Sequence, residues 1–308
     1  MGLLPTTLLL TLAYVYIFIM GLGFVVDLTC RRALVSDVTV ASLLPIAMAM
    51  ESIGMQSASL IGNQFGGLAI EFLGGRPNAV ALLACLQAVS TLLMCTVTVK
   101  RRAPPPRDGP GVVAQLVEGL KVLQTNRGLQ SILGVTAIGN FFFGPFFPIV
   151  QVLAARMHVS PSLTGLLASA SGYGGVTAAA FVVLAAPKRI GMLYWLGIAA
   201  THVLMPFTAL DSFWLVFAVI YVCGFGVGLF GSNQSALVIL TVAEEVKGRA
   251  LGLLVLCIGA SALGTFALGE LAERAGTSAS LVVFGVVGTV AQLAWFKYRP
   301  QAMFVLRS

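Results

Sequence analysis

Two acidic side chains, Glu51 and Asp27, lie within or at the end of long apolar segments, where a carboxylate could bind a proton or a cation. Ionisable groups inside a bilayer are costly and usually serve a function. Glu51 follows Pro45 by six residues, about 9 Å along a helix. Coupling to a proton or ion is one hypothesis for both. The alternative for Glu51 is pairing in a cytoplasmic vestibule with Arg31, Arg32 or Arg249. The alternative for Asp27, four residues before Arg31, is a local cytoplasmic ion pair.

Five uncharged polar side chains could contact a substrate from within apolar segments. Tyr14 and Tyr16 lie in the first segment and Tyr221 lies in the seventh. Gln56 and Ser59 lie near the middle of the second. Aromatic rings with a hydroxyl can stack on a ligand or bond it. The alternative is that all five only pack neighbouring helices together.

Asn140 and Gln151 flank a stretch that cannot form an undisturbed helix. Two glycines and two prolines occur there within ten residues, at Gly139, Gly144, Pro145 and Pro148. Proline removes a backbone donor, and a broken helix inside a bilayer is tolerated mainly where protein or a water-filled cavity satisfies the freed carbonyls. We therefore predict that Asn140 and Gln151 are cavity polar groups. The alternative is a structural kink, with Asn140 bonded to a neighbouring helix.

Composition excludes several classes of function. Only 9% of the 308 residues are charged and 58% are hydrophobic, and the mean hydropathy is +0.98. These values fit an integral membrane protein rather than a soluble domain. No catalytic cluster, metal-ligand set or phosphate-binding loop is present in the sequence, so we expect no enzyme activity, no metal and no cofactor. The net charge of +7 is explained by cytoplasmic loops, so we expect no nucleic-acid partner.

Nine apolar runs are each long enough to cross a bilayer. They cover residues 6–26, 45–72, 78–99, 130–155, 162–186, 190–208, 212–235, 248–272 and 278–297. The chain is therefore predicted to be an all-α, multi-pass membrane protein with about nine transmembrane helices, in contact with the lipid bilayer.

The distribution of positive charge predicts the orientation. With the N-terminus outside, fifteen of the eighteen Lys and Arg residues fall on the cytoplasmic side. The three on the other side are Arg76, Arg156 and Arg274. Cytoplasmic loops carry an excess of Lys and Arg, so we expect the C-terminus in the cytoplasm.

A Pro-rich, charged linker divides the chain unequally. Residues 100–129 begin KRRAPPPRDGPG and continue into an amphipathic helix at the cytoplasmic interface. We predict a partial N-terminal bundle of three helices at 1–99, this linker, and a six-helix bundle at 130–308. Many transporters pair two six-helix bundles, so the chain is expected to lack the first three helices of a six-plus-six protein.

Two glycine motifs are interpreted as helix contacts. Gly226, Gly228 and Gly231 match a dinucleotide fingerprint only as a string, because no βαβ unit surrounds them. Small residues let membrane helices approach closely. We predict this role for them and for Gly62 and Gly66.

Five ordered stretches resemble the major facilitator superfamily, in particular its proton-driven drug and siderophore exporters of the enterobactin type. They are DLTCRRALVSDV (27–38), GNQFGGLAIEFLGG (62–75), EGLKVLQTNRGLQSIL with GNFFFGPFFPIV (118–133 and 139–150), VAEEVKGRALGL (242–253) and GELAERAG (269–276). The resemblance covers essentially the whole chain, and it identifies the nine helices with helices four to twelve of that fold.

The resemblance implies a function. It indicates a secondary transporter in a prokaryotic cell (inner) membrane that exports a small-molecule substrate by alternating access, with protons as coupling ion. It also implies that helices four, seven and ten surround a central cavity. A different hypothesis remains open: a non-transporting scaffold or regulatory protein derived from a transporter, because three helices alone cannot enclose a cavity.

Overall fold

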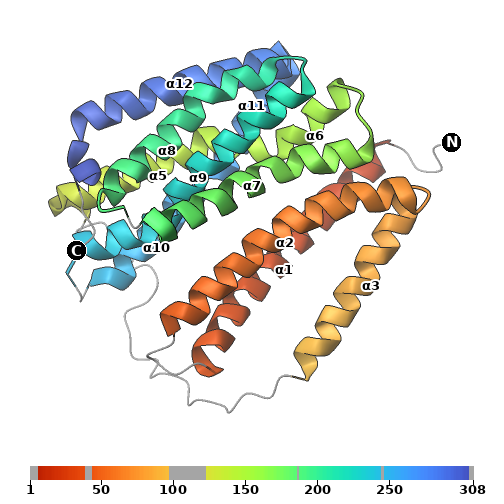
Figure 1. Ribbon diagram of the computed structural model, residues 1–308, viewed down its shortest axis with the longest axis horizontal. Helices are drawn as coiled ribbons and strands as arrows, with labels where there is room; N and C mark the ends of the chain where they lie inside the picture. Colours follow the sequence, from red (N-terminus) through yellow and green to blue (C-terminus); the bar gives the residue numbers. More distant parts are fainter. Residues whose placement is uncertain (1–5, 39–43, 97–122, 186, 244–245, 305–308) are drawn as a thin grey trace. The chain divides into compact units, whose positions relative to one another are not determined.

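The computed structural model describes residues 6–38, 44–96, 123–185, 187–243 and 246–304, and these residues are almost wholly helical (Figure 1). The predicted amphipathic helix before Leu123 lies outside the described residues. In chain order the helices are α1 (Thr6–Val38), α2 (Leu44–Phe72), α3 (Arg76–Cys95), α5 (Arg127–Phe143), α6 (Phe146–Arg156), α7 (Pro161–Ala185), α8 (Ile190–Leu204), η1 (Met205–Ala209), α9 (Phe213–Thr241), α10 (Lys247–Ile258), α11 (Ala260–Ala275), α12 (Thr277–Tyr298) and η3 (Pro300–Phe304).

The prediction of an all-helical membrane bundle is confirmed. Each of the nine apolar runs coincides with one helix or with a pair of consecutive helices. Within the described residues, seven stretches from α3 onward are long and apolar enough to cross a membrane, and α1 and α2 occupy the two remaining runs. Three spans are interrupted, between α5 and α6, α8 and η1, and α10 and α11.

The first helix is longer than predicted. The first apolar run ends at residue 26, next to Asp27, but α1 continues for eleven residues beyond Asp27 to Val38. The segment from Asp27 to Val38 contains no glycine or proline, and Arg, Ala and Leu favour the helix. The end of an apolar run therefore marks where hydrocarbon contact stops, which is not where backbone hydrogen bonding stops.

The chain divides into two compact units. One combines Met1–Met55 with Ala84–Pro106, and the other combines Gln56–Leu83 with Arg107–Ser308. The turn between α2 and α3 belongs to the second unit. It uses Gly74 and Gly75, whose φ angles of +78° and +119° are open to glycine at no steric cost.

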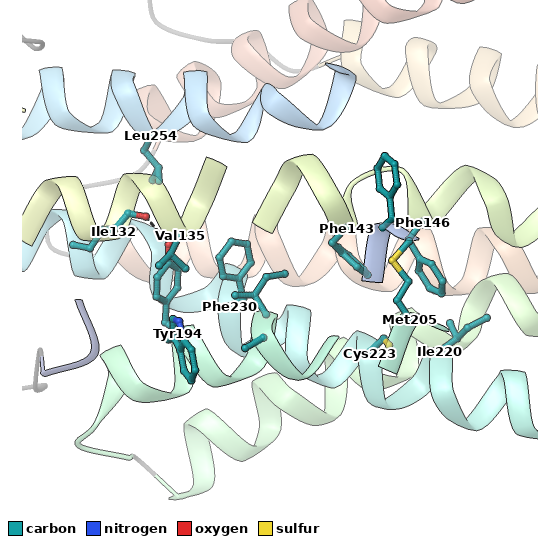
Figure 2. Close-up of a cluster of buried hydrophobic side chains, with 14 of the residues drawn as sticks. Ile132, Val135, Phe143, Phe146, Tyr194, Met205, Ile220, Cys223, Phe230 and Leu254 are labelled. Carbon is teal, nitrogen blue, oxygen red and sulfur yellow. Dashed lines mark hydrogen bonds between the residues drawn. The ribbon is translucent and has the colours of Figure 1, made fainter. Parts of the chain in front are cut away.

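The core of the second unit lies among α5, α6, α8 and α9. Figure 2 shows Tyr194 beside Phe230, and their stacked rings have centroids 4.9 Å apart. Phe146, Met205 and Ile220 form another part of the same cluster, each at most 1% exposed. Large side chains from helices distant in sequence thus fill one interior.

Polar side chains join the ends of these helices. Asn126 caps α5, because its Oδ1 accepts the N–H of Leu129 at 2.9 Å. The same side chain donates through Nδ2 to the carbonyl of Thr241 at 3.0 Å. One residue therefore both starts α5 and attaches it to the end of α9.

The first turns of α5 are also bonded to α12 and η3. Ser131 donates to the carbonyl of Arg299 at 2.5 Å and accepts the N–H of Ala302 at 3.0 Å. Gln292 donates to the carbonyl of Val135 at 3.1 Å. Because hydrocarbon offers no water as a substitute partner, these bonds favour one arrangement of the three segments.

Candidate substrate cavity and helix interfaces

The span from Arg127 to Arg156 is broken at Gly144 and Pro145, as the sequence predicts. Pro145 has no N–H, so the carbonyl of Phe141 loses its partner within the helix. Gly264 of α11 packs on that carbonyl so closely that a Cβ on Gly264 would collide with it. Gly144 likewise packs against Ser261. The break is therefore covered by α11, and glycine is required on both sides of the contact.

Asn140 makes its hydrogen bond within its own helix. The Nδ2 group donates to the carbonyl of Thr136 at 2.8 Å, and the side chain is partly buried. This bond lies within α5, so it is neither the expected contact with a neighbouring helix nor a contact with a cavity. A substrate contact by Asn140 stays a prediction.

Gln151 lies on the wall of a cavity of about 500 Å³ in the second unit. The α2, α3, α6 and α7 segments of this unit line it. Its polar side chains come from three further residues, Asn63, Arg76 and Thr164. Polar and apolar groups therefore share the wall about equally, and convergent polar groups can orient a small molecule. This is the cavity that we take as the candidate substrate site.

The cavity adjoins a close contact between α2 and α7. Gly67 and Gly165 face one another so closely that a Cβ on Gly67 would lie 3.0 Å from the Cα of Gly165. Ser169 of α7 donates to the carbonyl of Leu60 at 2.9 Å. Glu71 accepts the N–H of Ser162 at 3.1 Å. Glycine and serine thus allow backbone-to-backbone packing beside the cavity.

This contact corrects one glycine prediction. Among the described residues, nothing lies within 4 Å of a Cβ added to Gly62 or Gly66. The close approach is made instead by Gly67, one position further along. The spacing of small residues was the right signal, but the face that α2 presents to α7 depends on how the two helices are rotated about their axes.

A second set of small residues joins α7, α8 and α9. Gly226 packs on the Gly197 backbone, and Gly228 packs on Ala178, so the predicted helix contact is confirmed for both. Gly231 has nothing within 4 Å among the described residues. Tyr221 donates to the hydroxyl of Thr177 at 3.2 Å, between α9 and α7. The hydroxyl of Tyr221 thus has a partner on a neighbouring helix. A contact of Tyr221 with substrate stays a prediction.

The remaining candidate residues lie on α1 and α2. Tyr14 and Tyr16 are 72% and 63% exposed on α1, in the first unit. Asp27 is exposed on the same helix and has an interaction partner. Glu51, Gln56 and Ser59 lie on α2, and their side chains fall outside the described residues. Their proposed roles stay predictions.

Sequence reasoning did not single out Asn63, Arg76 or Thr164 as cavity residues. Each comes from a different helix, and two of them lie near helix ends, where a polar residue needs no special explanation. In the parts of the chain that the structure describes, no three His, Cys, Asp or Glu residues come together as metal ligands.

Comparisons with known proteins agree with this architecture. No curated protein matches the chain. Among solved structures, it is similar to a bacterial homolog of the human lysosomal transporter Spinster, in an inward-facing and unoccupied conformation. The TM-score is 0.57 at 14% identity, over 89% of this chain and 75% of that one, so this likeness concerns the fold alone. The profile described as Major Facilitator Superfamily matches residues 1–257, and the chain therefore belongs to that superfamily.

Proposed function

We propose that the protein is a secondary active transporter that exports a small molecule of the drug or siderophore class by alternating access, coupled to protons, in the cell (inner) membrane. The observation that carries this proposal is the superfamily match over residues 1–257. Membership makes the chain a multi-pass membrane protein of a family that transports small molecules. Export, protons and the substrate class go beyond that membership, and they rest on the sequence motifs.

The cavity and its neighbouring interface support the mechanism. Alternating access needs an interface beside the substrate site that can separate and close again. The contact of Gly67 with Gly165 is made by backbone atoms, so at this point α2 and α7 can part without moving large side chains. It adjoins the cavity that holds Gln151 and Arg76. A cavity next to a close helix contact in the same unit supports a substrate site that opens and closes at that contact.

Transport is tested with the purified protein in liposomes. An imposed proton gradient should drive accumulation of ethidium or of a catecholate siderophore, and a protonophore should abolish the accumulation. Empty liposomes are the control. No flux above that control with folded protein, together with a stoichiometric partner in the purification, would favour the scaffold hypothesis instead.

A matched pair of variants links the flux to the interface. Gly67→Leu should reduce transport at least tenfold, because the added side chain meets the backbone of Pro161 and Gly165. Ala58→Leu adds a comparable group to an exposed position of α2 and should leave transport unchanged. Gly67→Ala should have an intermediate effect. Equal flux in all three variants would remove this interface from the mechanism.

A further inference from the structure

Four positively charged residues lie at one end of the second unit, and we call them the basic patch. Lys188 and Arg189 directly precede α8, while Lys297 and Arg299 lie at the end of α12. Figure 1 shows α8 beginning and α12 ending at the same end of the bundle. Both helices belong to stretches long and apolar enough to cross a membrane. The patch therefore lies where these spans leave the hydrocarbon, at the level of the lipid headgroups.

Two contacts bring the two pairs of cations to the same place. Gly191, two positions after the first pair, packs so closely on the carbonyl of Ala302 in η3 that a Cβ on Gly191 would collide with it. Phe296, directly before the second pair, lies against Trp195 of α8, with ring centroids 4.7 Å apart. The backbone on both sides of the basic patch is therefore held by packing within one unit.

The segments that meet at the basic patch contain no carboxylate that could neutralise it. The sequence has no Asp or Glu from residue 119 to 210 or from 274 to 308, and these ranges include α5, α8, α12 and η3. Among the described residues, none of the four cations forms an ion pair. The guanidinium of Arg299 lies 4.7 Å from the centroid of the Tyr298 ring, a contact that leaves its charge in place. The counter-charge must come from another molecule.

The position of the basic patch selects the kind of anion. Arg and Lys donate charge-assisted hydrogen bonds to phosphate oxygens. Tyr298 is 67% exposed and Leu293, on the same helix, is 51% exposed, so an aromatic ring and apolar surface adjoin the charges as at a membrane interface. A zwitterionic headgroup brings its own ammonium group, whereas an anionic phospholipid has a net negative charge to offset the patch.

We propose that the basic patch binds the phosphate of an anionic phospholipid, of the phosphatidylglycerol type, whose acyl chains lie along the exposed apolar surface of α8 and α12. The lipid supplies the negative charge that the neighbouring segments lack. The site is separate from the candidate substrate cavity and does not depend on transport, so either proposal can fail without the other.

The three tryptophans of the chain make a local test possible. Trp195 and Trp295 lie near the basic patch, and Trp214→Phe removes the third, which lies beyond the other end of α8. This variant is reconstituted in liposomes with an increasing share of brominated phosphatidylglycerol or brominated phosphatidylcholine. Bromine quenches the fluorescence of nearby tryptophan, so the two quenching curves give the relative affinity of the two lipids. We expect phosphatidylglycerol to bind about tenfold more tightly.

Further substitutions in this background decide whether charge is the cause. Lys297→Gln with Arg299→Gln should remove most of the preference, and so should Lys188→Gln with Arg189→Gln. The charge-keeping exchange of Lys297→Arg with Arg299→Lys should retain it. Arg274→Gln, before the other end of α12, controls for net charge and should have no effect. The proposal is overturned if the two lipids quench alike, if the neutral variants retain the preference, or if inorganic phosphate in the buffer removes it, because a soluble anion would then be the occupant.

Discussion

At the scale of single residues, Tyr194 shows how a polar group is accommodated inside the second unit. Its hydroxyl donates to the carbonyl of Ile132 at 2.8 Å and lies 2.7 Å from the hydroxyl of Thr136. Its ring stacks on Phe230 (Figure 2). The side chain thus joins α8 to α5 through the hydroxyl and to α9 through the ring.

Tyr194→Phe should keep the stacking and lose the hydroxyl bonds. The carbonyl of Ile132 belongs to a helix, so removing the hydroxyl does not leave it wholly without a hydrogen-bond partner. The change should therefore lower the unfolding free energy by about 1–2 kcal/mol. Denaturant titration in detergent, followed by tryptophan fluorescence, measures it. The exposed change Tyr298→Phe is the control, and equal stability of the two variants would contradict the assignment.

At the scale of elements, α9 is placed by glycine contacts on two sides. Gly226 meets the carbonyl of Gly197 on α8, and Gly224 meets the backbone of Ser171 on α7. Without a hydrophobic drive between helices in lipid, such close approach supplies the packing contacts that hold a bundle together.

Gly226→Ala and Gly231→Ala should have opposite effects, although both lie on α9. The first puts a methyl group against the Gly197 carbonyl and the Thr201 hydroxyl, and overpacking of this kind costs about 1–3 kcal/mol. The second has open space among the described residues and gains up to about 1 kcal/mol in helix propensity. Thermal unfolding in detergent compares the stability of the two variants. If both lose a similar amount of stability, the contact of Gly226 with α8 does not stabilise the protein.

At the scale of the whole molecule, the three arginines predicted on the outer side have local explanations. Arg156 lies 2.8 Å from Asp211 and donates to the carbonyl of Ala209 at 2.9 Å, and it also contacts Ser278. It therefore ties α6 to the turn before α9 and to the first turn of α12. Arg274 pairs with Glu270, and Arg76 lines the cavity. Each of the three arginines therefore has a local partner or contact, which is compatible with the excess of Lys and Arg expected in cytoplasmic loops.

The predicted orientation can be tested by cysteine labelling. In a background without the five native cysteines, His158→Cys should react with a membrane-impermeant maleimide in intact cells. Lys188→Cys, in the turn between α7 and α8, should react only after the membrane is permeabilised. Both positions are exposed, so the side of the membrane on which each cysteine lies decides whether it reacts in intact cells. The reverse pattern would place the C-terminus outside and overturn the orientation.

The amino-acid sequence by itself determined the helical spans and the site of the main break. The spans follow from the thickness of the hydrocarbon, and the break follows from Pro145, because both effects act within a few turns of one helix. Gln151 was also identified from its position after that break, and the structure places it on a cavity wall.

Only the tertiary structure decided which residues meet. Gly67 rather than Gly66 contacts α7, and the glycine of α12 that makes room for His202 lies 86 positions away in the chain, at Gly288. Hydropathy is nearly uniform around these helices, so the pattern does not specify which face turns inward. Rotation of each helix is settled by contacts with distant segments, and those contacts exist only once the bundle has formed.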